Sequence, residues 1–213
     1  MTGGAGGASV DDALVAEALR LNTRYVREVV LDWHLCPWAE KALTGGQVRQ
    51  GVLLDEAPAA EAALPFLDEL VAAPEIAIGL LIFPRATMRA AQFDAYAERV
   101  RRADHARKPD AATSPPAPAF LIAAFHPGAT ETFTTPPQLV SFVRRTPDPT
   151  LQFVRTSVLR KVTGEGSRVS DEVTQRNHET VNARGAAELD GVLREIRRDR
   201  DETYARLGCG DLR

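Results

Sequence analysis

The sequence predicts an α/β or α+β domain, in which a small parallel or mixed sheet of at least three strands is flanked by helices and followed by a helical C-terminal part. Short apolar runs at residues 48–54, 75–83 and 119–125 have the length of buried strands. Segments with helical spacing separate these runs, and such alternation favours right-handed crossover connections. The segments that follow the third run are predicted to be helical.

The first predicted element is a long amphipathic helix that begins after Ser9. Ser9 and Asp12 have the spacing of a capping box, in which each side chain bonds the other residue's backbone. Apolar residues then repeat at helical spacing: Leu14, Val15, Ala18, Leu19, Tyr25, Val26, Val29, Val30 and Trp33. The helix is expected to end near Pro37, because the residue before a proline is pushed out of the α-helical region.

The middle of the chain supplies the strands and the helices between them. After the strand at residues 48–54, a second helix is predicted from Pro58 to Pro74. Residues 75–83 form a nearly continuous apolar run, which is typical of a central strand buried on both faces. A helix over residues 88–105 follows. Residues 108–118 contain four prolines and are predicted to form a surface loop.

The rest of the chain is predicted to be helical, in four segments. These are residues 137–143, 149–162, 169–182 and 189–207, with Gly185 as an interruption before the last one. A chain of 213 residues suits a single domain, which we place at residues 9–207. The Gly-rich residues 1–8 are expected to be disordered, and residues 208–213 to form a short tail.

Composition excludes several classes of partner. The net charge of −3 gives no basic excess for nucleic acid, and no apolar stretch approaches the ~20 residues that span a bilayer. Only two cysteines are present and they are far apart, which indicates a reducing, cytoplasmic location. Dinucleotide-binding, P-loop, serine-hydrolase and zincin motifs are absent from the sequence. The composition is compatible with a homo-oligomer.

His126 is the leading candidate for a functional residue. It follows the apolar run at residues 119–125 directly and precedes Pro127 and Gly128, so it lies at a strand end, where α/β proteins often bind ligands. An imidazole there can act as an acid–base group near neutral pH, or bind a metal or a haem iron. The alternative is a histidine that caps the strand by bonding backbone groups.

Arginines near the turn at residues 144–149 form the second candidate group. Arg145 and Arg155 could converge on a carboxylate or phosphate, because guanidinium groups bind such anions through two hydrogen bonds. Alternatively, each arginine pairs with a buried carboxylate or covers apolar surface. Asp148 is a potential carboxylate partner for His126 or Arg145. Asn177, on a later helix, could hydrogen-bond the pocket loop, and Cys36 is interpreted as a buried structural cysteine.

Three separated segments and one later asparagine resemble an uncharacterised bacterial family, the domain of unknown function DUF1415. The segments are Trp33 with Leu-Cys-Pro-Trp-Ala at residues 35–39, Ala-Phe-His-Pro at 124–127, and residues 144–155, and the asparagine is Asn177. The resemblance covers roughly residues 14–190 and implies a shared fold and pocket, but no activity. This chain departs from the family pattern with Arg144 in place of Asn, Asp148 in place of Tyr and Gln152 in place of His.

These observations together predict a small-molecule enzyme with a pocket at a strand end. His126 would act as the acid–base group or as the ligand of iron or haem, as in a haem- or metal-dependent oxidoreductase. Arg145 and Asp148 would complete the catalytic group, while Arg155 and Asn177 would bind a cofactor, and the arginines would hold an anionic group of the substrate or cofactor. The alternative is a non-catalytic ligand-binding or scaffold protein in which the same residues are structural.

Overall fold

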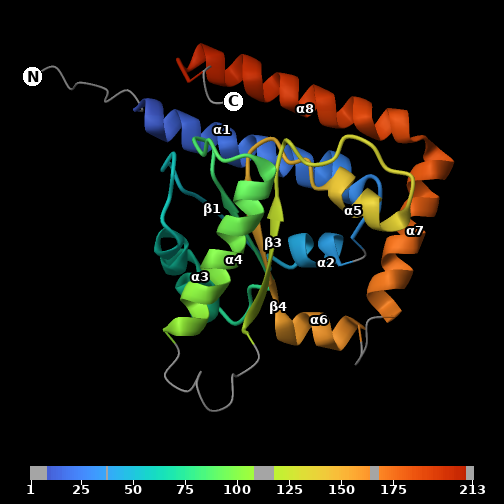
Figure 1. Ribbon diagram of the computed structural model, residues 1–213, viewed down its shortest axis with the longest axis horizontal. Helices are drawn as coiled ribbons and strands as arrows, with labels where there is room; N and C mark the ends of the chain where they lie inside the picture. Colours follow the sequence, from blue (N-terminus) through green and yellow to red (C-terminus); the bar gives the residue numbers. More distant parts are fainter. Residues whose placement is uncertain (1–8, 37, 108–117, 164–167, 210–213) are drawn as a thin grey trace, which may run out of the picture.

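A computed structural model describes residues 9–36, 38–107, 118–163 and 168–209. They form an α+β fold with a four-stranded mixed sheet of strand order β1-β2-β4-β3, which confirms the predicted class (Figure 1). The strands are β1 (Val48–Val52), β2 (Ile78–Ile82), β3 (Phe120–Phe125) and β4 (Thr150–Arg155). The predicted disordered segment at 1–8 lies outside the described ranges, as do residues 108–117 of the predicted loop at 108–118 and residues 210–213 of the predicted tail at 208–213.

Most helices lie where the sequence predicts them. They are α1 (Val10–Tyr25), η1 (Val26–Leu31), α2 (Ala39–Thr44), η2 (Ala60–Ala63), α3 (Leu64–Ala72), α4 (Ala90–Ala106), α5 (Pro136–Val143), α6 (Thr156–Thr163), α7 (Arg168–Arg184) and α8 (Ala186–Arg206). The capping box of Ser9 and Asp12 is present at the start of α1. The first predicted helix continues beyond Tyr25 as η1, a π-helical segment with wider turns.

The prediction of a helix over residues 149–162 was wrong in its first half. Residues 150–155 form β4, an interior strand that is antiparallel to both β2 and β3, and only α6 is helical. Thr150, Leu151, Gln152 and Phe153 alternate between polar and apolar, which is the pattern of a strand with two different faces. Pro149 resembled the first residue of a helix, but its carbonyl oxygen accepts a hydrogen bond from Phe83 N at 2.9 Å and extends the sheet.

The two faces of the sheet have different surroundings. Helices α3 and α4 cover one face with the main hydrophobic core, to which β4 contributes Leu151 and Phe153 (Figure 1). On the other face, residues of α1, η1 and α2 approach Ile78, Leu80 and Gln152 and leave space between helix and sheet. The alternating pattern of β4 therefore turns one set of side chains into the core and the other toward this space.

Of the C-terminal helices, α8 packs on the N-terminal helix α1 and α7 packs on α5, and neither covers the core face. Figure 1 shows α8 beside α1 and antiparallel to it, and Leu14, Leu21 and Tyr204 form a small apolar cluster between the two helices. A second cluster joins η1, α5, α7 and α8, and contains Tyr25, Trp33 and other apolar residues. Within the described ranges, no helix is both long enough and apolar enough to cross a membrane.

Candidate ligand cavity

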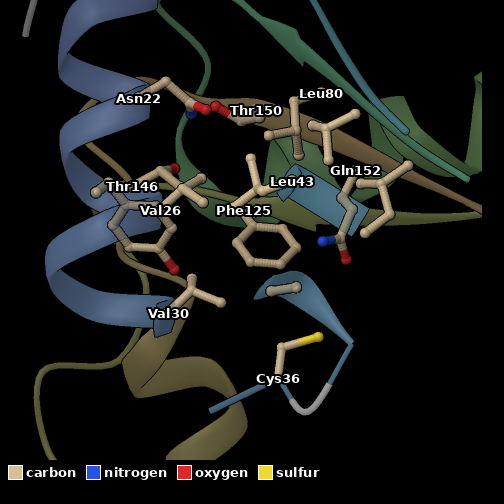
Figure 2. A pocket seen from close by; sticks show the side chains of 14 residues that line it. Asn22, Val26, Val30, Cys36, Leu43, Leu80, Phe125, Thr146, Thr150 and Gln152 are labelled. Atoms are coloured by element: carbon tan, nitrogen blue, oxygen red, sulfur yellow. The ribbon is translucent and has the colours of Figure 1, made fainter. Parts of the chain in front are cut away.

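The space between the sheet and the helices consists of two chambers that share part of their lining. The inner chamber, about 60 Å³, lies between α1, η1, α2 and the sheet (Figure 2). The outer chamber, about 460 Å³, extends from there toward α5, α6 and α7. Residues that line both chambers are Tyr25, Val30, Cys36, Phe125 and Gln152. Because these five side chains belong to both linings, we describe the two chambers as one cavity.

All four strands contribute to the floor of the cavity, and β3 and β4 supply the residues nearest its centre. Thr150 and Gln152 lie on the same side of β4, opposite to Leu151 and Phe153 in the core. Phe125 is the last residue of β3 and pairs with Thr150 across the sheet. Figure 2 shows the Phe125 ring in the middle of the view, with the Gln152 amide on one side of it. The floor is thus largely apolar and has one amide within it.

Arg144 lines the outer chamber and is the cationic side chain of the cavity. Its guanidinium lies 5.3 Å from the centre of the Phe125 ring. Burial lowers the pKa of Arg144, and attraction to Tyr25 and Asp94 offsets this effect only in part. Among the residues that the structure describes, no carboxylate forms an ion pair with this guanidinium. An arginine remains charged even so, and a half-buried charge without a counter-ion is energetically costly.

The other titratable groups of the cavity are neutral. Burial raises the pKa of the Tyr25 phenol, whose hydroxyl donates a hydrogen bond to the Val143 carbonyl oxygen. Burial also raises the pKa of the Cys36 thiol, although backbone N–H groups of Trp38 and Ala39 act in the opposite direction. The thiol therefore lines both chambers as a neutral, polarizable group rather than as a thiolate.

Asn177 fixes one wall of the outer chamber. Its side-chain N–H donates a 2.8 Å hydrogen bond to the Leu35 carbonyl oxygen, which ties α7 to the segment that follows η1. Trp38, at the start of α2, also lines this chamber. Helix α7 therefore closes the cavity on the side away from the sheet, and the hydrogen bond from Asn177 to Leu35 holds the helix against the segment that follows η1.

His126 points away from the cavity and bonds backbone groups through both ring nitrogens. Gly128 N donates to Nδ1 at 2.9 Å, so the proton is on Nε2, which lies 2.8 Å from the Met88 carbonyl oxygen. The ring also packs on Phe93, at 5.9 Å between centres. This is the geometry of the strand-capping alternative. His126 N bonds Arg144 O at 2.9 Å, so the same residue positions Arg144 beside the end of β3.

Replacing His126 with glutamine is expected to remove a pH dependence of stability. Burial lowers the pKa of His126 from its ordinary 6.5, so the folded protein binds fewer protons here than the unfolded chain. The stabilisation is complete above about pH 6.5 and is lost as the pH falls through the lower folded-state pKa. Urea unfolding should be measured at about pH 7.5 and pH 5. The free energy of unfolding should fall less between these two pH values for H126Q than for the wild type. The exposed His105 provides the control H105Q, which should behave as the wild type, and an unchanged pH dependence in H126Q would contradict the assignment.

The structure does not bring Arg145, Asp148 and Arg155 together with His126. Arg145 donates to Asp190 on α8 at 2.8 Å and stacks over Phe142. Asp148 is fully buried and binds Arg200 and Tyr204 of α8. Arg155, at the far end of β4, donates to backbone carbonyl oxygens at the end of α3. None of these side chains is among the described residues that line either chamber.

A haem or iron site at His126 does not fit these contacts. Both ring nitrogens are engaged with the backbone, so neither is available as a ligand without loss of the turn that follows β3. The described residues also contain no group of three or more His, Cys, Asp or Glu side chains that could hold a metal ion. Of the residues predicted to bind a cofactor, His126 and Arg155 thus bond backbone groups, whereas Asn177 lines the outer chamber.

Sequence reasoning missed Arg144, Gln152 and Asn22 as lining residues. Arg144 and Gln152 are two of the three positions where the chain departs from the family pattern, and both line the outer chamber. The alternation of β4 could have indicated that Gln152 faces away from the core. Asn22 gave a weaker signal, as a polar residue among the buried positions of an amphipathic helix.

The fold and the cavity define an α+β protein in which helices enclose a largely apolar cavity that contains one arginine. Residues 17–190 match the family described as protein of unknown function (DUF1415), so the chain belongs to this family, as its motifs suggested. The comparison with curated proteins and the comparison with solved structures returned no match.

Proposed function

We propose that the protein binds a small, largely apolar molecule with an acidic group in this cavity, and that Arg144 holds the acid. The observation that carries the proposal is the half-buried Arg144 guanidinium, which faces a mainly apolar chamber without an ion pair in the described part of the chain. A carboxylate or phosphate of a ligand would supply the missing counter-ion, and guanidinium groups bind both through paired hydrogen bonds.

The surroundings of Arg144 favour a carboxylic acid on an apolar body. The outer chamber is lined by side chains such as Leu139, Val140 and Val143, which can contact hydrocarbon but cannot neutralise additional charge. A single cation suits a monoanion better than a multiply charged group. The small anionic partner predicted from the sequence is therefore kept in this proposal, with Arg144 in the role first given to Arg145 and Arg155.

Binding is better supported than acid–base catalysis. Efficient general acids and bases have pKa values near the working pH. The two proton-donating groups of the cavity, Tyr25 and Cys36, both have pKa values raised by burial, so both stay neutral at pH 7. The proposal therefore follows the non-catalytic ligand-binding alternative. Cys36 and Cys209 are both free thiols, which supports a cytoplasmic location for this function.

Replacing Arg144 with methionine is expected to weaken the binding of decanoate by about tenfold or more, because a hydrogen-bonded charge pair is lost. Isothermal titration calorimetry gives the affinity, and the fluorescence of Trp38 in the chamber wall gives an independent signal. R144M should melt at the same temperature as the wild type or higher, since the substitution removes a half-buried charge without a counter-ion.

Two variants serve as controls for this measurement. R144K keeps the positive charge and should retain most of the affinity, whereas R102M removes an exposed arginine of α4 and should bind as the wild type. Decanol, which has the same chain without the acid, should bind wild type and R144M equally. Equal decanoate affinities in wild type and R144M, with both proteins folded, would contradict the proposed function.

A further inference from the structure

The inner chamber contains a buried polar atom without a partner. Asn22, on α1, is 1 % exposed and lines this chamber. Its side-chain oxygen Oδ1 has no hydrogen-bond partner in the part of the chain that the structure describes. A buried amide group left without a partner costs free energy. An asparagine at this position on an otherwise apolar helix face therefore lacks a partner among the described residues, and a bound molecule would supply one.

The neighbouring hydroxyl groups cannot supply that partner. Thr146 and Thr150 also line the inner chamber, and Figure 2 shows Thr150 beside the Asn22 amide. However, each of the two hydroxyls donates its proton to the Asp148 carbonyl oxygen, at 2.7 Å and 2.9 Å respectively. A hydroxyl has one proton to donate. Neither threonine can therefore donate to Asn22 without breaking a bond to Asp148.

Arg144 and Asn22 lie in different chambers that share five lining residues. Arg144 belongs to the outer chamber and Asn22 to the inner one. Figure 2 shows Asn22 at the opposite end of the inner chamber from Cys36, which lines both chambers. The lining between these two ends consists mainly of apolar side chains such as Val30, Leu80 and Phe125. The outer chamber thus contains the cation, the inner chamber contains the amide, and the lining that the two chambers share is mainly apolar.

From this arrangement we infer that the ligand is a carboxylic acid with a hydroxyl group at the far end of an aliphatic chain, an ω-hydroxy acid. The acid lies at Arg144, so the inference rests on the proposed function. The chain lies along the mainly apolar lining that the two chambers share, and the terminal hydroxyl donates to Asn22 Oδ1. A hydroxyl suits an amide in either orientation, because it both donates and accepts hydrogen bonds.

The test compares acids of equal length with and without the terminal hydroxyl. Octanoate, decanoate and dodecanoate are titrated into the wild-type protein beside their ω-hydroxy counterparts, and the ratio of the two dissociation constants is measured for each length. At the length that spans the cavity, the hydroxy acid should bind about tenfold more tightly. Exposing a hydroxyl to apolar surroundings at other lengths should weaken binding instead.

The N22L variant isolates the contribution of Asn22. Leucine has a similar size, so N22L should bind the plain acids at least as well as the wild type and should lose the preference for the hydroxy acid. The inference is overturned if the plain acids bind through Arg144 and no chain length shows a preference for the hydroxyl, because water is then the hydrogen-bond partner of Asn22. The proposed function stands in that case. If no acid binds the wild type, the proposed function fails as well. The wild-type series decides the question even if N22L does not fold.

Discussion

Replacing Asp148 with alanine is expected to lower the free energy of unfolding by about 3 kcal/mol or more. The Asp148 carboxylate is fully buried and accepts hydrogen bonds from Arg200 Nε at 2.8 Å and from the Tyr204 hydroxyl at 2.7 Å. It joins the turn before β4 to helix α8. Without it, the buried Tyr204 hydroxyl loses its acceptor and Arg200 loses its ion pair with this residue. Thermal unfolding should show the loss as a decrease of roughly 6–12 °C in Tm.

Two milder variants separate the parts of this contact. D148N keeps an acceptor oxygen of similar shape but removes the charge, so it should destabilise less than D148A. Y204F removes a single hydrogen bond to a buried carboxylate and should cost about 1.5–3 kcal/mol. If D148A melts like the wild type, the contact between β4 and α8 does not stabilise the fold. A loss of ligand binding without any loss of stability would instead place Asp148 in a functional site, as the sequence suggested.

Replacing Arg155 with methionine is expected to lower the free energy of unfolding by about 2–4 kcal/mol. The reason is that the Arg155 guanidinium donates hydrogen bonds to carbonyl oxygens at the end of helix α3, which have no partner within the helix. Arg155 Nη2 donates to the carbonyl oxygens of Leu70 and Ala73 at 2.6 and 2.7 Å, and Nε donates to that of Ile76 at 2.7 Å. The guanidinium also lies 4.5 Å from the centre of the Phe120 ring. In R155M these carbonyl oxygens lose a charged donor, and urea unfolding should show a lower free energy of unfolding.

The comparison with R155K and R102M tests the geometric part of this explanation. A lysine keeps the charge but cannot reach three carbonyl oxygens with a planar fork, so R155K should recover only part of the stability. R102M, at an exposed position of α4, should stay within about 0.5 kcal/mol of the wild type. A stable R155M protein with weakened decanoate binding would favour the anion-binding role that the sequence suggested for Arg155.

Local patterns in the sequence predicted the α+β class, the boundaries of most helices and three of the four strands. These features depend on the spacing of apolar residues and on caps and breaks, such as Ser9 with Asp12 at the start of α1, which involve near neighbours in the chain. The family assignment likewise follows from segments that can be recognised one by one. The fourth strand was missed because Pro149 indicated a helix start more strongly than the four alternating residues 150–153 indicated a strand.

The roles of the polar residues depended on contacts between distant parts of the chain. Asp148 has its partners on α8, and Arg155 has its partners at the end of α3, so nothing near either residue in the sequence distinguishes a structural contact from a ligand contact. Arg144 differs from them because, among the described residues, no carboxylate forms an ion pair with it. Whether a charged group is satisfied is a property of three-dimensional packing, and only the tertiary structure could move the candidate site from His126 to the cavity.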